Sequence, residues 1–82
     1  MKNVKIVTYV PSSHADAVRE ALGAAGAGVI GEYSYCSFTV NGTGRYLPSS
    51  SAQPFIGTPG TFEQTPEERV EVVCAKNMPK LP

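Results

Sequence analysis

Residues 26–31 of this chain read GAGVIG, and the patterns on either side of them decide the fold. The spacing G-x-G-x-x-G is typical of a dinucleotide-binding loop when it follows a strand and opens a helix. Here the order is reversed, because a helical pattern precedes the glycines and an alternating pattern follows them. The amides would then lie at the C-terminal end of the helix dipole, where a pyrophosphate is disfavoured. We therefore interpret GAGVIG as a turn, with Gly26 ending the helix and Gly28 and Gly31 leading the chain into a sheet.

The helix before this turn is predicted from the sequence SSHADAVREALGAAGAG. Ser12 or Ser13 is expected to cap its first amides, and Asp16 complements the positive end of its dipole. At about 100° per residue, one side of the helix is apolar and is expected to pack on a sheet. This side holds Ala17, Val18, Ala21, Leu22 and Ala25. The opposite side is expected to face solvent and holds Asp16, Arg19, Glu20 and Gly23.

Alternating residues predict strands before and after the helix. Residues 4–10 end at Pro11 and have no clearly polar face, which indicates a central strand covered on both sides. Residues 33–40 place Cys36, Phe38 and Val40 on one face and Tyr35, Ser37 and Thr39 on the other.

Asn41-Gly42 then predicts a tight hairpin turn, with a returning strand over residues 45–47. Proline, glycine and serine predict a long irregular loop over about residues 48–66, with an apolar stretch at Pro54–Gly57. A further strand is predicted over residues 68–74, with Val70, Val72 and Cys74 on one face.

This order of elements predicts a single α+β domain over residues 1–82, with a mostly antiparallel sheet and a helix on one face. A ferredoxin-like βαββαβ unit would need a second helix and a last strand. The tail AKNMPKLP has no periodicity and holds two prolines, which limit any helix that begins there. We expect the second helix and last strand to be missing or incomplete.

Composition excludes several classes of function. Seven basic and seven acidic residues give a formal net charge of zero, so nothing indicates a nucleic-acid partner. No apolar run approaches the roughly 20 residues that span a bilayer. The N-terminal residues alternate and lack a cleavage site, so we expect a cytoplasmic protein with reduced thiols at Cys36 and Cys74. A chain of this size has a small core and is expected to gain from self-association.

Taken in order, these residues resemble a known family. The shared pattern covers nearly the whole chain and consists of Val18-Arg19, GAG at 26–28, Ile30-Gly31, Tyr33, Cys36-Ser37-Phe38, Gly42-Thr43-Gly44, Tyr46, Pro48, Pro54–Gly57 and Arg69-Val70-Glu71. It is similar to the PII/CutA-like domain of the YqfO family, within the dinuclear-metal, "GTP cyclohydrolase I type 2-like" group, a domain that also occurs alone. Two departures are Gln53, where the family usually has Asn, and the end at Pro82, before the family's H-P-Y-E-E segment. This resemblance implies a ferredoxin-like domain that forms trimers through its sheet edges, and relatives that bind small effectors or divalent metals.

Two sets of residues are candidates for binding. A metal site, with copper or zinc as the ion, would take nitrogen, sulfur and oxygen ligands from His14, Cys36 and Glu32, contributed by several subunits. A small anionic ligand would meet glycine-rich backbone, a guanidinium and aromatic rings. This second set holds Asn41, Gly42, Gly44, Arg45, Tyr33 and Tyr35. Each residue also has a structural alternative, as a helix-start or turn residue, a buried thiol or an interface aromatic.

The sequence offers no nucleophile beside a base and no paired carboxylates with a pocket, so an enzyme is not expected. The leading hypothesis is a PII/CutA-like trimer that binds a small ligand or metal between subunits, in a regulatory or assembly role. A structural lid or oligomerisation domain for a separate metal-dependent hydrolase, and a divalent-metal binding protein, remain as alternatives.

Overall fold

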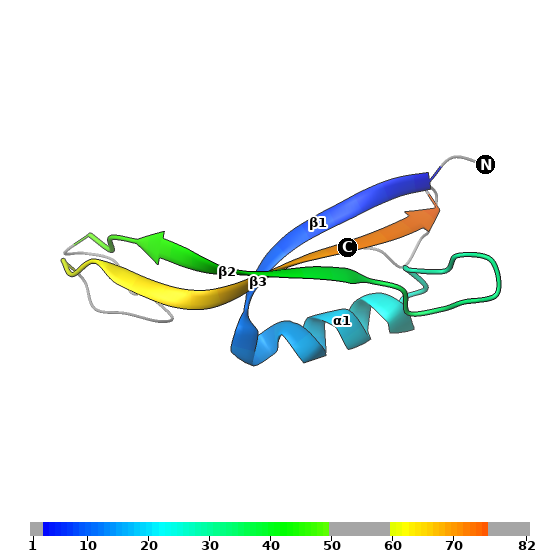
Figure 1. Cartoon of the computed structure of the whole chain (residues 1–82), viewed down its shortest axis with the longest axis horizontal. Coiled ribbons are helices and arrows are strands. Elements are labelled where there is room, and N and C mark those ends of the chain that lie inside the picture. The colour runs from blue at the N-terminus through cyan, green and yellow to red at the C-terminus, as the bar shows by residue number, and fades with distance from the viewer. Residues whose placement is uncertain (1–2, 50–59, 76–82) are drawn as a thin grey trace.

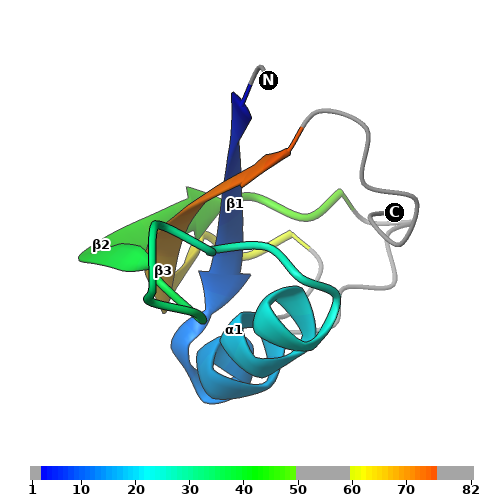
Figure 2. The ribbon, with the colours of Figure 1, turned by 90° about the vertical axis from the view of Figure 1, so that its right-hand side faces the viewer.

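A computed structural model of the chain describes residues 3–49 and 60–75 (Figure 1). The elements are β1 (Asn3–Pro11), the 3-10 turn η1 (Ser12–His14), α1 (Ala15–Ala24), β2 (Phe38–Tyr46) and β3 (Glu63–Ala75). The strands form one antiparallel sheet, and α1 lies against one of its faces (Figure 2). The predicted α+β class is confirmed, and the arrangement is consistent with a ferredoxin-like fold. No helix in these ranges is long and apolar enough to cross a membrane.

Within residues 3–49 and 60–75 the central strand is β3, and the prediction that residues 4–10 form the central strand is wrong there. The strand order is β1-β3-β2, with β1 paired from Asn3↔Ala75 to Pro11↔Glu67. Within this sheet β1 is an edge strand. Its mixed composition does not reflect burial on both faces, because Val7 and Tyr9 on one face are exposed. Its outward side chains stay exposed instead, as Tyr9 shows with 67% of its surface accessible.

The predicted hairpin turn at Asn41-Gly42 is also wrong. Strand β2 runs straight through these residues, which pair with Glu68 and Glu67 of β3. A two-residue turn of this type needs positive φ at both central positions, and Gly42 is not among the glycines with positive φ. The strand that β2 needs as a neighbour is β3, which begins at Glu63 and takes up the end of the predicted 48–66 loop. The apolar stretch Pro54–Gly57 and the tail after Ala75 lie outside the described residues.

Beyond the end of β1, the paired strands β2 and β3 continue as a two-stranded projection (Figure 1). We call this the arm and define it as residues 43–46 and 63–66. Neither β1 nor α1 pairs with it or covers it in Figure 1. A two-stranded ribbon is only marginally stable by itself, so the arm is a part of the chain that gains from further contacts.

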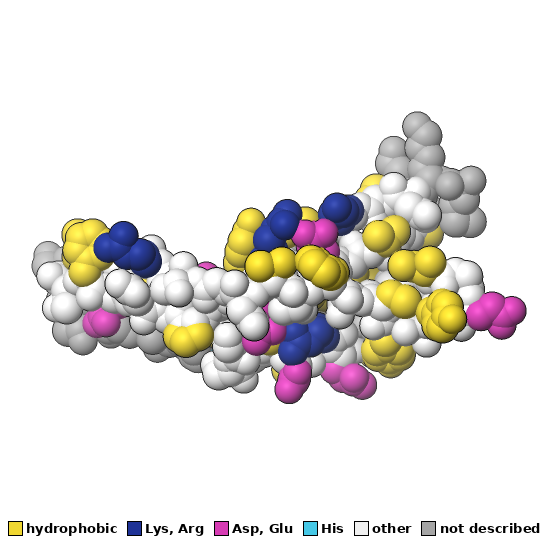
Figure 3. Space-filling model, viewed as in Figure 1, with side chains coloured by type: hydrophobic (Ala, Val, Ile, Leu, Met, Phe, Trp, Pro, Cys, Tyr) yellow, Lys and Arg dark blue, Asp and Glu magenta, His cyan; other side chains and the backbone are white. Residues whose placement is uncertain are grey.

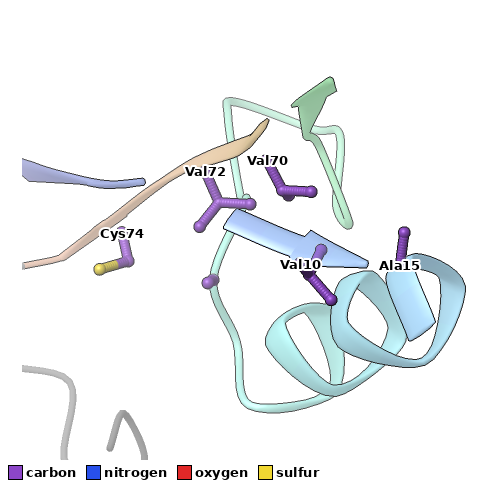
Figure 4. Close-up of a cluster of buried hydrophobic side chains, with 6 residues drawn as sticks. Val10, Ala15, Val70, Val72 and Cys74 are labelled. Atoms are coloured by element: carbon purple, nitrogen blue, oxygen red, sulfur yellow. The ribbon is translucent and has the colours of Figure 1, made fainter. Parts of the chain in front are cut away.

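The core lies between α1 and the sheet (Figure 4). Its buried residues are Val10, Ala15, Ala27, Val70, Val72 and Cys74. Ile6, Val18 and Leu22 pack against this cluster. The prediction that Val70, Val72 and Cys74 share one face of a strand is therefore confirmed. Val70 is the largest side chain that is completely buried, so the core is small for a chain of this length.

The helix is rotated from the predicted orientation but keeps part of the predicted packed side. Val18 and Leu22 pack on the core and Ala25 is partly buried, whereas Ala17 and Ala21 are exposed. Ala15 is fully buried. Arg19 and Gly23, which are predicted to face solvent, contact the sheet and the ring of Tyr35 instead.

The structure contradicts the prediction for the N-terminal end of the helix and confirms the prediction for its C-terminal end. Ser12 and Ser13 form η1 and do not cap α1, whose N-cap is His14 without a side-chain hydrogen bond. At the C-terminal end, Gly26 has φ 101° and its N–H donates to the Gly23 carbonyl at 3.0 Å. The Ala27 N–H donates to the Leu22 carbonyl at 3.0 Å, which completes a Schellman motif. The predicted helix stop at Gly26 is confirmed.

Candidate functional site

The sheet face opposite α1 carries apolar side chains that the described residues leave uncovered. Val70, Val72 and Cys74 point to the core, so their alternating neighbours on β3 and the residues paired with them point the other way. We call this the open face. It holds Lys5, Val7, Tyr9, Phe38, Val40, Glu67, Arg69, Glu71 and Val73. Tyr9 is 67%, Phe38 62%, Val40 46% and Val7 36% exposed.

A row of paired charges crosses the open face. The Lys5 Nζ lies 3.3 Å from Glu71 Oε1, and the Arg69 Nη1 lies 2.5 Å from Glu71 Oε2. One carboxylate therefore serves two cations. The Arg69 Nε is buried and has no hydrogen-bond partner among the described residues. On the side of the molecule away from α1, Figure 3 shows charged side chains of both signs among hydrophobic ones.

Two hollows open beside this row of charges. The first has a volume of about 180 Å³ and is lined mainly by Ile30, Cys36, Phe38 and Val73, with the Lys5–Glu71 pair. The second has a volume of about 150 Å³ and lies where β1, β2 and β3 run side by side. Its lining residues are Tyr9, Val40, Asn41, Gly42, Thr43, Glu67 and Arg69. Both are large enough for a small group and too small to enclose a nucleotide.

The GAGVIG segment crosses from α1 to the sheet as a turn. The N–H of Gly28 donates to the Val73 carbonyl at 2.7 Å, and the Cys36 N–H donates to the Gly28 carbonyl at 2.8 Å. Ile30 and Tyr33 exchange two hydrogen bonds of 2.9 Å around Gly31. Because the Gly28 amide is buried and already bonded within the chain, it cannot receive a phosphate. This confirms the turn interpretation.

The three residues predicted as metal ligands lie apart. Within residues 3–49 and 60–75, no group of three or more His, Cys, Asp or Glu could hold a metal ion. His14 is exposed, and its Nδ1 lies 2.8 Å from the Ser13 hydroxyl. Glu32 is exposed in the turn between Ile30 and Tyr33, and Cys36 is partly buried at the first hollow. Cys36 and Cys74 are both free thiols.

The residues predicted to bind a small ligand are divided between places. Asn41 and Gly42 line the second hollow. Gly44 and Arg45 lie on the arm, where the Arg45 guanidinium is 5.4 Å from the centre of the Phe62 ring. Tyr33 is 74% exposed in its turn. Tyr35 has φ 59° and packs its ring on Gly23, which is a structural role.

Two arginines with clear roles were overlooked or misplaced by the sequence reasoning. The Arg19 Nη1 donates to Glu68 at 2.7 Å and to the Thr39 hydroxyl at 3.2 Å, and its Nη2 donates to Asp16 at 2.6 Å. The hydrogen bonds to Glu68 and, second, to Asp16 raise the pKa of Arg19. Arg69 is the cation at the second hollow, although the sequence analysis did not single it out as a binding residue. Its alternation with the buried Val70 was the signal that placed it on the opposite face.

Comparisons with known proteins identify homologous segments. No family model matches the chain. The chain is 51% identical over 72 residues to the GTP cyclohydrolase 1 type 2 homolog of Halalkalibacterium halodurans, covering 88% of this chain and 19% of that protein. With the protein of the same name from Mycobacterium tuberculosis, the identity is 54% over 70 residues, or 85% of this chain and 18% of the other.

A solved structure shows the same fold. The Bacillus cereus protein related to NIF3 superimposes with a TM-score of 0.73 and 39% identity, over 93% of this chain and 19% of that one. The chain thus spans about a fifth of the length of the relatives it matches. The family resemblance deduced from the motifs is confirmed. The chain is homologous to one segment of the GTP cyclohydrolase 1 type 2 homologs.

Proposed function

We propose that this chain is a non-enzymatic, PII/CutA-like module that assembles with copies of itself, as a trimer, and binds a small ligand or metal ion where subunits meet. Its role would be regulation or assembly. The open face is the observation that carries this proposal. Its apolar residues are strand residues of the type that normally pack against a second layer. A second copy of the chain would supply that layer.

Charge favours a second copy as the occupant. Lys5 and Arg69 balance Glu67 and Glu71 on the open face, and the whole chain has a formal net charge of zero, so copies do not repel one another. Val70 is the largest fully buried side chain among the described residues, so association would complete a fold whose own core is small.

The described residues support a non-enzymatic role. The Ser13 hydroxyl and His14 Nδ1 are within hydrogen-bond distance, but both residues are exposed neighbours in η1. Neither lines one of the two hollows. A nucleophile and base need a site that holds substrate and excludes water, and no such site surrounds this pair.

Light scattering tests the assembly. We expect a particle of about 26 kDa, three times the 8.7 kDa chain, at micromolar concentration. Phe38→Asp places an unpaired charge on the open face and should shift the mass towards one subunit. Val29→Asp is a matched control, because Val29 is 57% exposed but belongs to the GAGVIG turn. A wild-type monomer would contradict the proposal, as would an equal effect of both variants.

A lid or oligomerisation domain for a separate metal-dependent hydrolase is the second proposal. It is favoured by the match to about a fifth of much longer relatives. The test uses the GTP cyclohydrolase 1 type 2 homolog of Bacillus subtilis, from which the segment that matches this chain has been deleted. Binding between that shortened protein and this chain is then measured. Failure to bind, with both proteins folded, would remove this role.

A metal-binding role is tested by titration of zinc and copper into the wild type, His14→Ala and Cys36→Ser. This role is contradicted if the three proteins bind the metal ions equally well.

A further inference from the structure

We propose that the second hollow is a site for an oxyanion, with Arg69 as the residue that binds the carboxylate or phosphate group of a small ligand. The inference rests on the proposed function and deepens it by naming the chemical class of the ligand. It also changes the predicted anion site, because Asn41 and Gly42 line the same hollow as Arg69, whereas Arg45 lies beside Phe62 on the arm.

Arg69 has hydrogen-bonding capacity beyond its contacts within the described residues. Its Nη1 bonds Glu71, a carboxylate that is shared with Lys5, and 42% of the Arg69 side chain stays accessible. Its Nε is enclosed without a partner. A buried donor in this state marks a side chain whose placement its internal contacts do not explain. An arginine carries five donors in a planar fork that matches a carboxylate or a phosphate.

The backbone of β2 forms the opposite wall of the hollow. Asn41, Gly42 and Thr43 line this wall. Gly42 has no side chain, and a Cβ built there meets no atom within 4 Å, so the space above it is open. Gly42 pairs with Glu67 and Val40 pairs with Arg69, so this open space adjoins the guanidinium. An oxyanion can therefore reach Arg69 from above Gly42.

The acidic residue in the lining does not neutralise Arg69. Glu67 turns its carboxylate along the arm, because a Cβ built on Gly44 would lie only 2.5 Å from Glu67 Oε1. The ion pairs of Arg69 in the described residues do not include Glu67. The exposed ring of Tyr9 lies on the third side and can cover a planar part of the ligand. The site thus combines a cation, an open space above Gly42 and an aromatic wall.

Nuclear magnetic resonance titration of the full chain at low salt provides the test, with inorganic phosphate in one series and acetate in the other. We expect saturable shifts at the amides of residues 41–43. The probe that binds more tightly identifies the ligand group as a phosphate or a carboxylate. Arg69→Gln should weaken binding at least tenfold, the loss expected for one charge-assisted hydrogen bond. Arg45→Gln removes the same charge from the arm and should change the affinity less than twofold.

A second variant keeps the test valid if Arg69→Gln unfolds. Gly42→Val fills the hollow without changing any charge, and a β-branched residue is favoured in a strand. It should abolish the saturable shifts while the spectrum stays dispersed. The proposal is overturned if neither probe gives saturable shifts in wild type, if Gly42→Val binds normally, or if Arg45→Gln alone removes binding.

Sedimentation of the same samples separates this inference from the proposed assembly. A monomer that binds phosphate through Arg69 supports the anion site and contradicts the assembly. An oligomer whose spectrum does not change with either phosphate or acetate contradicts the anion site and supports the assembly.

Discussion

Substitution of Gly28 by alanine should destabilise the fold far more than the same substitution at Gly31. Both glycines have positive φ, 84° and 58°, so alanine at either position adopts a left-handed conformation. That conformation costs about 1–2 kcal/mol for an L-residue. The two sites differ in the space that is available for an added Cβ atom. A Cβ on Gly31 meets nothing within 4 Å, whereas a Cβ on Gly28 lies 2.5 Å from the Cys36 carbonyl oxygen and 2.8 Å from the Cys36 nitrogen.

The contact at Gly28 cannot relax cheaply, because the obstacle is backbone. Gly28 and Cys36 are joined by a 2.8 Å hydrogen bond, and the Gly28 N–H is bonded to Val73 at 2.7 Å. Moving Cys36 away would stretch one bond, and moving Gly28 would break the other. Overpacking of this kind typically costs a further 1–3 kcal/mol. We expect a loss of about 1–2 kcal/mol for Gly31→Ala and of roughly 2–5 kcal/mol for Gly28→Ala.

Urea denaturation followed by circular dichroism measures both losses, at one protein concentration because the chain is proposed to associate. Gly42→Ala supplies the baseline, since Gly42 has neither positive φ nor a contact within 4 Å. The expected order of destabilisation is Gly28, then Gly31, then Gly42. Equal losses at Gly28 and Gly31 would refute the close approach of Gly28 to Cys36. A negligible loss at both would refute the positive φ angles as well.

Further predictions concern the core, alkaline pH and the anion site. Val70→Ala removes two buried methyl groups and should cost about 2–3 kcal/mol in urea denaturation, against less than about 0.5 kcal/mol for Val29→Ala. Desolvation and the carboxylates of Glu63 and Glu67 raise the pKa of Tyr46 above its usual value of about 10. Because the unfolded chain loses this proton first, stability should fall above about pH 10, and Tyr46→Phe should lessen the fall in unfolding curves across that range. Glu67→Gln removes the acidic member of the second hollow and should tighten phosphate binding, which the titration described above would detect; weaker binding would place the anion elsewhere.

Local patterns in the sequence were sufficient to predict the features that depend only on neighbouring residues. Alternation placed Val70, Val72 and Cys74 on the buried face, because a strand period of two is independent of its partners. The helix stop at Gly26 followed from the freedom of glycine at positive φ. The same reasoning excluded a nucleotide loop at GAGVIG, since the order of helix and strand is itself local information.

Features that depend on distant residues could not be read in this way. Asn41-Gly42 is a turn sequence only when no other strand is available, and β3 pairs with both residues from more than twenty positions away. The rotation of α1 was missed for the same reason. Arg19 turns to the sheet because Glu68 and Thr39 are there, and neither residue is identifiable as its neighbour from the helix sequence. The position of Arg69 beside Asn41 and Gly42 likewise exists only once β2 and β3 are paired.

Assembly through the open face and anion binding at Arg69 would influence each other, because both use the same surface. Covering the face with a second copy removes water from Arg69, and a desolvated cation without sufficient partners is costly. A bound oxyanion would supply the missing partner, so association and anion binding should favour each other by the same factor. Sedimentation at a fixed chain concentration should then show more of the oligomer as phosphate is added at constant ionic strength. Arg69→Gln should make association independent of phosphate, because it removes the charge that the anion compensates. A phosphate response that survives in Arg69→Gln would show that the two events are coupled through another residue.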